Sequence, residues 1–206
     1  MIAVMIIFMI DVMNNVNRLQ GAHVKVSKDR VAEHRTRIMT AAARLFRRRG
    51  FDDVTVAEVM KEAGLTHGAF YGHFPSKEAL IGEAVGHALP LKLGDPGLRR
   101  SAAEFADGYL SVKHRDNRAS SCLFSSLGTE AARGSAELRH SMTASVRRRI
   151  DHLSAGAAGA TPQQKRRAAI AAWSAMVGAM VLARIVDDEE LSKEILNETR
   201  GSLPLA

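Results

Sequence analysis

Apolar side chains recur at steps of three and four residues over most of the chain, which is the period of an amphipathic helix. The first such segment predicts a helix over residues 28–49. Ser27 is placed to cap its start, and Gly50 follows where a left-handed residue commonly ends a helix. The face of this helix consists of Val31, His34, Ile38, Ala41, Ala42, Leu45 and Phe46.

A second pattern begins at Thr55, which stands three residues before Glu58 and so has the spacing of a capping box. The apolar positions that follow predict a two-turn helix that Gly64 ends. Thr66 is placed as the N-cap of a short helix over about 67–74, which Pro75 cannot extend. Ser76 then caps a fourth helix that runs to about Leu93, with Pro90 expected to kink or shorten it.

Gly94–Gly97 (GDPG) is the best candidate for a domain boundary. Beyond it the spacing predicts helices over about 98–110, 121–132, 138–153, 161–185 and 187–200. Residues 168–183 are apolar nearly all round, so we expect burial on more than one side. That stretch is too short and too rich in alanine to indicate a membrane span. No alternating strand pattern occurs, so the sequence predicts an all-α fold.

Residues 1–10 are almost purely apolar, but they are too few to span a bilayer and lack the basic flank and cleavage site of a signal peptide. We expect residues 1–27 to be an N-terminal extension, disordered or arising from a mis-assigned start, with Met13 as an alternative start. The expected division is therefore 1–27, an N-terminal domain over 28–93 and a C-terminal domain over 94–206.

The 206-residue chain has a formal net charge of +7, which favours a polyanionic partner such as nucleic acid. Cys122 is its only cysteine, which excludes an intrachain disulfide and a multi-thiolate zinc site and indicates a reducing cytoplasm. The sequence has no carboxylate pair, phosphate-binding loop, dinucleotide fingerprint or nucleophile motif. A His-Arg-Asp tripeptide at 114–116 has no other kinase motif beside it. We expect neither an enzyme nor a bound metal or cofactor.

Two short helices joined by a tight glycine turn form a helix-turn-helix, whose second helix can enter the major groove of DNA. His67 is the expected base contact, with help from Thr66, and Gly68 permits a close approach. Tyr71 and His73 are expected to contact phosphates, as is Lys77. The candidate DNA-binding residues are Thr55, Thr66, His67, Gly68, Tyr71, His73 and Lys77. Phe70 and Phe74 are expected in the core.

The sequence also contains two arginine triplets. Arg47 to Arg49 end the first helix, where cations suit the helix dipole, and one or two of them could touch phosphate. Arg147 to Arg149 lie outside the motif and are expected to form a solvated face.

The stretch TVAEVMKEAGLTHGAFYGHFPSKEAL, residues 55–80, resembles the DNA-binding domain of the TetR/AcrR family of transcriptional regulators. That domain typically reads TVxxIAxxAGVSxGxxYxHF, and the resemblance covers about residues 28–84. The matching positions are Thr55, Val56, Ala63, Gly64, Leu65, Thr66, Gly68, Tyr71, His73, Phe74, Lys77 and Leu80.

The resemblance implies about nine helices and a homodimer that binds a palindromic operator in double-stranded DNA. In such a dimer the last two helices, here about 161–185 and 187–200, pair as a four-helix bundle. It also implies a small-molecule effector, of unknown identity, bound in the C-terminal domain. Candidate pocket residues, each also suited to a plain core position, are Tyr109, Phe124, Met142, Trp173 and Met176.

Three functions therefore stay open. The leading one is a ligand-responsive repressor, and the second is a constitutive or activating regulator without a small ligand. The third is a basic helical protein that meets a membrane surface or another protein. A monomer with a fully buried central helix is the alternative to the dimer.

Overall fold

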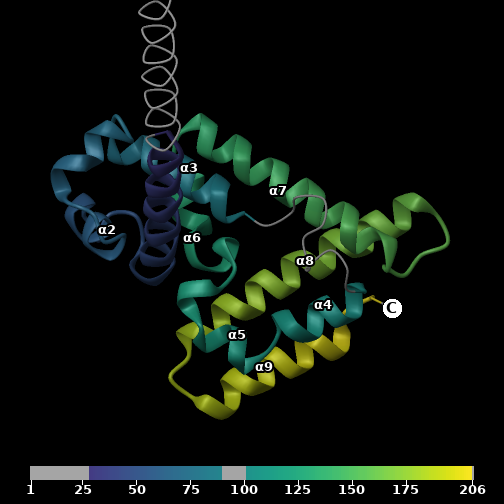
Figure 1. Ribbon diagram of the computed structural model, residues 1–206. Helices are drawn as coiled ribbons and strands as arrows, with labels where there is room; N and C mark the ends of the chain where they lie inside the picture. Colours follow the sequence, from purple (N-terminus) through teal and green to yellow (C-terminus); the bar gives the residue numbers. More distant parts are fainter. Residues whose placement is uncertain (1–27, 90–100, 206) are drawn as a thin grey trace, which may run out of the picture.

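The computed structural model describes residues 28–89 and 101–205, and those residues fold almost entirely as helices (Figure 1). A first helix covers residues 28–49. It is followed by α2 (Val56–Glu62), the 3-10 helix η1 (His67–Gly72), α3 (Lys77–Ala88), α4 (Ala102–Tyr109), α5 (Val112–Asp116), the 3-10 helix η3 (Arg118–Ser120), α6 (Leu123–Ala132), α7 (Ala136–Ala155), α8 (Pro162–Ile185) and α9 (Glu189–Ser202). Within the described ranges, β pairing is limited to one isolated bridge between Ala157 and Leu205. The predicted all-α fold is confirmed.

Some predictions fall outside the described residues. They concern the extension over residues 1–27 with its Ser27 cap, Pro90, and the boundary at Gly94–Gly97. α3 ends at Ala88, earlier than the predicted Leu93, and the described part of the fifth helix begins at Ala102.

The helix starts follow local side-chain chemistry. Thr55 and Thr161 each form a capping box, and Pro162 occupies the first turn of α8 as the sequence predicted. Ser76 caps α3 by accepting a hydrogen bond from the Ala79 N–H at 3.2 Å. The five-residue helix α5 was not predicted, because it is too short for a hydrophobic period to show.

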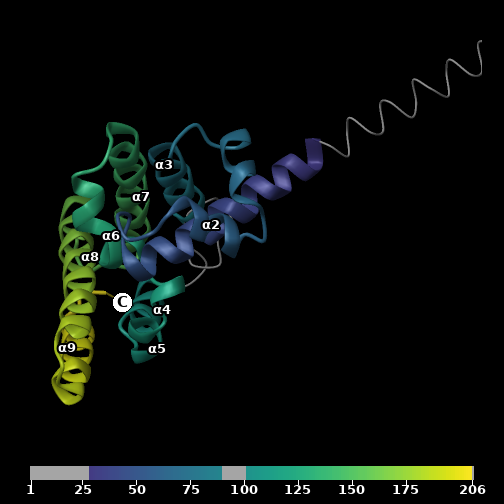
Figure 2. The ribbon, with the colours of Figure 1, turned by 90° about the vertical axis from the view of Figure 1, so that its left-hand side faces the viewer.

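The helices form two connected parts. The first helix, α2, η1 and α3 lie together at one end, and we call residues 28–89 the head (Figure 1). The remaining helices, over residues 101–205, form the body, in which α8 packs on both α7 and α9. Figure 2 shows α8 and α9 along the edge of the molecule that lies farthest from the start of the first helix.

The head is joined to the body through a shared apolar core. Helix α3 packs on α7, and Leu127 and Leu138 of the body belong to the same buried cluster as the head residues Phe46 and Phe74. Glu130 of α6 also accepts a hydrogen bond from the backbone N–H of Phe51 at 2.5 Å. A second cluster fills the body around Trp173, Met176 and Met180.

Helix α8 has 24 residues and a mean hydropathy of 1.7 in its most apolar window, so by length and composition it could cross a membrane. From the sequence, only residues 168–183 were considered as a possible membrane span, whereas the whole helix α8 is long enough for one. One face packs inside the body through Ala169, Trp173, Met176 and Met180. A core helix of a soluble protein has the same properties.

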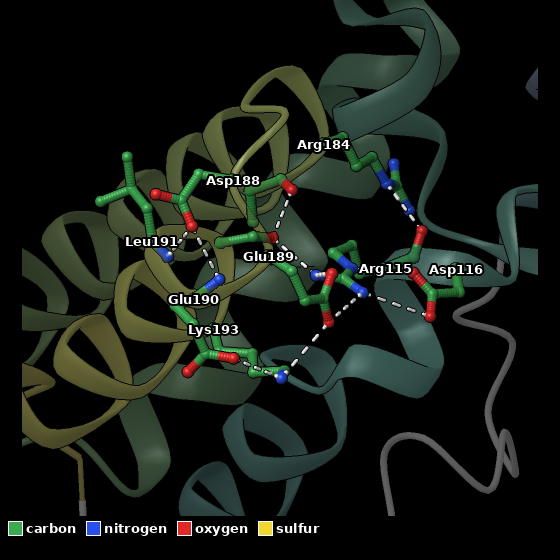
Figure 3. A network of polar contacts seen from close by, with 10 residues as sticks. Arg115, Asp116, Arg184, Asp188, Glu189, Glu190, Leu191 and Lys193 are labelled. Atoms are coloured by element: carbon green, nitrogen blue, oxygen red, sulfur yellow. Dashed lines mark hydrogen bonds and ion pairs between the residues drawn. The ribbon is translucent and has the colours of Figure 1, made fainter.

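A polar network fastens α5 to α8 and α9 (Figure 3). Arg115 is nine-tenths buried and donates to Asp116 and Glu189, and to the Ser192 hydroxyl at 2.7 Å. Arg184 of α8 donates to the carbonyl oxygens of His114 and Arg115 at 3.2 and 3.1 Å. The His-Arg-Asp tripeptide therefore takes part in holding the body together.

Candidate nucleic-acid interface

The first helix of the helix-turn-helix is fixed by its N-terminal capping box. The Glu58 carboxylate accepts from the Thr55 backbone N–H at 2.8 Å, and the Thr55 hydroxyl oxygen accepts from the Glu58 N–H at 3.3 Å. Arg49 adds an ion pair with Glu58 at 2.7 Å. The bond from the Thr55 N–H, followed by Arg49, lowers the pKa of Glu58 to about 2. Thr55 is therefore already engaged in starting α2.

The turn that follows requires glycine at position 64. Gly64 has φ of +67°, and a Cβ there would lie 2.8 Å from Nη2 of Arg37. That same nitrogen donates to the carbonyl oxygen of Ala63 at 2.6 Å, so it covers the end of α2. The backbone N–H of Leu65 closes the turn on Met60 at 2.9 Å. The tight glycine turn predicted from the sequence is confirmed.

The second helix is a 3-10 helix over His67–Gly72, whereas the sequence predicted a short helix over about 67–74. Gly68 and Gly72 lower its tendency to form a regular α-helix. Phe70 and Phe74 are fully buried, as predicted, and Pro75 blocks extension. Thr66 is the N-cap residue of η1, as predicted, but its side chain makes no capping hydrogen bond.

Four of the seven candidate residues, in or next to η1, are exposed, and we call the surface that they form the outward face of η1. Thr66, His67 and Gly68 are exposed, and Tyr71 exposes 71% of its surface although it is a large aromatic residue. A Cβ placed on Gly68 would meet nothing within 4 Å, so the backbone here can approach another molecule closely. The buried rings of Phe70 and Phe74 hold this face outward.

His73 and Lys77 are less exposed than these four residues, and both contact other residues of the head. His73 is half-buried, and its ring packs against His34 at a centroid distance of 6.0 Å. Burial, followed by the charges of His34 and Arg35, lowers the pKa of His73, which favours its neutral form. Lys77 is half-buried, and its Nζ lies 3.4 Å from the carbonyl oxygen of Asp52. Its ammonium thus lies near the surface of the head and points toward the Asp52 carbonyl oxygen.

Ion pairs within the head use several of its arginines. Arg35 pairs with Glu83 of α3, and Arg44 pairs with Glu62 of α2. Arg49 is taken by Glu58, whereas Arg48 of the same triplet is exposed. These pairs bind the first helix to α2 and α3.

A cavity of about 320 Å³ lies where the head meets the body. Three of the five candidate pocket residues, Tyr109, Phe124 and Trp173, line it. The Trp173 ring is 5.3 Å from the ring of Tyr109 and 5.7 Å from that of Phe124. Met142 and Met176 do not line it, and each is buried in one of the two apolar clusters. That any of the five binds an effector stays a prediction.

Two cavity residues were not expected from the sequence. Arg149 was predicted on a solvated face, and this was wrong: it is only 7% exposed, and its guanidinium lies 3.9 Å from the centre of the Phe105 ring. Its spacing held the signal, because Arg149 stands seven residues after Met142 and four before Leu153, on the buried face of α7. Arg47 of the first helix lines the same cavity, and no local signal distinguishes it from Arg48.

The fold and the exposed helix define an all-helical protein with an N-terminal helix-turn-helix. The family model for "Bacterial regulatory proteins, tetR family" matches residues 38–84. Residues 38–84 of this chain are thus similar in sequence to the DNA-binding domain of that family.

Curated relatives match a little over a quarter of the chain. The HTH-type transcriptional regulator YdgC of Bacillus subtilis is 45% identical over 58 residues, which is 28% of this chain and 30% of that protein. The HTH-type transcriptional repressor Rv1474c of Mycobacterium tuberculosis is 39% identical over 57 residues, again 28% of this chain and 30% of that protein. These alignments thus span about a third of the relatives' length.

The fold similarity extends further. A TetR-family transcriptional regulator from Agrobacterium tumefaciens superposes with a TM-score of 0.67, covering 84% of this chain and 99% of that one. The two sequences are 18% identical, so this likeness concerns the fold. It includes the body as well as the head.

Proposed function

We propose that this protein is a transcriptional regulator that binds double-stranded DNA through the outward face of η1. The observation that carries the proposal is the exposure of Thr66, His67 and Tyr71 at a short helix that the fully buried Phe70 anchors in the head. His67 is suited to a base edge, and Tyr71 to a phosphate oxygen. The family model that matches residues 38–84 and the names of the curated relatives support DNA binding.

Lys77 makes a separable contribution in this proposal. Its ammonium would act as a point charge on the DNA backbone, so Lys77→Ala should weaken binding to all sequences alike and reduce the salt slope by about one unit. An unchanged salt slope would remove Lys77 from the phosphate contacts. His73 is the weakest of the candidates, because its ring is half-buried and its neutral form is favoured.

The proposed active form is a homodimer that pairs through α8 and α9. α8 leaves Ile170, Leu182 and Ile185 exposed by 44%, 53% and 71%, and Leu191 of α9 is exposed by 42%. Small residues lie between them on the exposed side of α8, namely Ala171, Ser174, Ala175 and Gly178. A contiguous apolar helix face of this kind is typical of a subunit interface.

The dimer is tested by analytical ultracentrifugation of Leu182→Glu and Ile185→Glu. We expect a monomer in both cases, because a charge on each subunit would be buried at a two-fold interface. Val112→Glu, at an exposed apolar position of α5, serves as the matched control and should remain dimeric. A dimer in all three variants would contradict this interface.

A two-fold dimer places two copies of η1 on DNA, so the operator should be palindromic with half-sites about one helical turn, or a multiple, apart. The experiment is selection of bound fragments from host genomic DNA, followed by footprinting. We expect protected sequences with two-fold symmetry. Protection without symmetry would argue against the dimeric reader, and failure to retain any fragment would overturn the proposal of DNA binding.

We further propose that the regulator is a repressor released by a small molecule bound in the cavity, and that it acts in the cytoplasm. The aromatic lining of the cavity supports an effector, and the name of the Mycobacterium tuberculosis relative supports repression. A regulator without an effector is the competing proposal. Thermal shift against a small-molecule panel separates the two, since only an occupied cavity stabilises the fold.

A further inference from the structure

The cavity at the head–body junction combines aromatic walls with an unusual placement of positive charge. Its walls come from both parts of the molecule: Arg47, Ala88 and Leu89 belong to the head, and the others belong to the body. The lining residues that matter below are Arg47, Phe105, Tyr109, Phe124, Arg149 and Trp173. The described lining as a whole includes two arginines and no aspartate or glutamate.

Arg47 is held by weak contacts. Its two terminal nitrogens donate to the carbonyl oxygens of Ala43 and Ala88 at 3.4 and 3.3 Å, near the limit for a hydrogen bond. Its Nε is buried and has no hydrogen-bond partner among the described residues. Arg47 also makes none of the ion pairs found in that part of the chain. Burial lowers its pKa, as expected for a cation that lacks a carboxylate partner.

The rest of the wall suits a flat ring with a polar edge. Trp173, Phe124 and Phe105 present ring faces and edges, and the Arg149 guanidinium lies 3.9 Å over Phe105 and 5.8 Å over Trp173. The Tyr109 hydroxyl is buried beside the Cys122 and Ser125 side chains and makes no hydrogen bond of ordinary geometry among the described residues. Burial raises the pKa of Tyr109, so this hydroxyl remains a neutral donor.

We propose that the cavity binds a planar aromatic acid, whose ring lies among Phe105, Phe124 and Trp173 and whose carboxylate is received by Arg47. This rests on the proposed function only in taking the cavity as the effector site. An anion supplies the partner that the buried guanidinium lacks, and a guanidinium binds a carboxylate through paired hydrogen bonds. A volume of about 320 Å³ admits a ligand of one or two fused rings.

The position of Arg47 also explains how such a ligand could act on DNA binding. Arg47 lies on the first helix, three residues before Gly50, and the rings that would hold the ligand lie on the body. An acid bound to both would favour one placement of the head relative to α7. A ligand shifts a conformational equilibrium only through such a difference in affinity between the two states.

The test is isothermal titration calorimetry of the full chain with three probes of the same size. They are 2-naphthoate, its neutral amide 2-naphthamide, and the cation 2-naphthylmethylammonium. We expect 2-naphthoate to bind at least ten times more tightly than the amide, and the cation not to bind. Arg47→Gln should abolish the preference for the acid over the amide. Arg48→Gln removes the same charge from the neighbouring exposed position and should leave the preference unchanged.

Equal affinity for 2-naphthoate and 2-naphthamide in the unmodified protein would overturn the inference, as would a preference that survives in Arg47→Gln. Absence of binding by all three probes would also overturn it. DNA binding by the ligand-free protein is measured separately by fluorescence anisotropy. DNA binding without a preference for the acid rejects this inference alone, whereas loss of DNA binding with the preference intact rejects the proposed function alone.

Discussion

The head and the body use cations in opposite ways. In the head, Arg35, Arg44 and Arg49 lie near the surface and pair with carboxylates on neighbouring helices. In the body, Arg115 and Arg149 are more than nine-tenths buried, the first in a polar network and the second against aromatic rings. Apart from Arg47 at the junction with the body, the head thus keeps its interior apolar and its ion pairs near the surface, whereas the body places charge inside. This difference suits a head that meets a polyanion and a body that encloses a ligand.

The strongest test of this comparison replaces neighbouring residues on opposite sides of η1. Phe70→Ala should lower the free energy of unfolding by about 4 kcal/mol, because a fully buried ring is lost from the head core. Tyr71→Ala should change it by less than about 0.5 kcal/mol, since that ring is mostly in solvent. Urea denaturation measures both. Similar losses for the two variants would show that η1 does not have one buried and one free side.

A second test concerns the buried charge of the body. Arg115→Ala should lower the free energy of unfolding by about 2 kcal/mol, because the hydrogen bonds to Asp116, Glu189 and Ser192 are lost together. Arg118→Ala, at an exposed position next to the network, should have almost no effect. Thermal unfolding distinguishes them. If the two variants are equally stable, the network in Figure 3 does not stabilise the body.

A third test sharpens the reading of the turn in the head. Gly64→Ala should cost about 1 to 2 kcal/mol, because alanine is strained at a φ of +67° and its Cβ would displace Arg37. Gly82→Ala in α3 should instead stabilise the protein by up to about 1 kcal/mol, since that glycine is helical and has open space around it. Chemical denaturation of both variants should give effects of opposite sign, and the same sign would contradict this reading.

The head was largely readable from the sequence because its structure is set locally. The Thr55 capping box, the turns at Gly50 and Gly64, and the buried Phe70 and Phe74 each follow from a residue and its near neighbours. The helices of the body were also predicted. The burial of Arg115 and Arg149 on these helices was not predicted, because it depends on partners far along the chain.

Two pairs of residues show why. Arg149 meets Phe105, and Arg115 meets Glu189 from a helix more than seventy positions away. No residue near either arginine signals these contacts, although the spacing of Arg149 from Met142 and Leu153 matches the buried face of α7 and was overlooked. In the same way, Arg47 differs from Arg48 only in the direction that it points from the first helix.

A fourth test, with the smallest expected effect, concerns the pH dependence of the free energy of unfolding, to which His114 of the body should contribute. Burial, followed by the charge of Arg184, lowers the pKa of His114, whose Nε2 accepts the Cys122 N–H at 3.0 Å and whose Nδ1 lies 2.7 Å from the carbonyl oxygen of Tyr109. The folded state therefore favours neutral histidine, and the unfolded chain binds more protons. The free energy of unfolding should fall as the pH drops below the ordinary histidine value of 6.5.

His114→Gln keeps an acceptor and does not titrate, so it should flatten this fall, whereas His140→Gln at an exposed position of α7 should not. Urea denaturation between pH 7 and pH 5 makes the comparison, and an identical pH dependence in both variants would show that His114 does not contribute.

The central claim is that the outward face of η1 makes the main contact with DNA, to which Lys77 of α3 adds one phosphate contact. Its most direct measurement is fluorescence anisotropy with one selected genomic fragment, comparing the unmodified protein, Tyr71→Ala and the exposed body variant His140→Ala. We predict at least tenfold weaker binding for Tyr71→Ala, with unchanged thermal stability, and unchanged binding for His140→Ala. Equal affinity of all three proteins for the fragment would contradict the account.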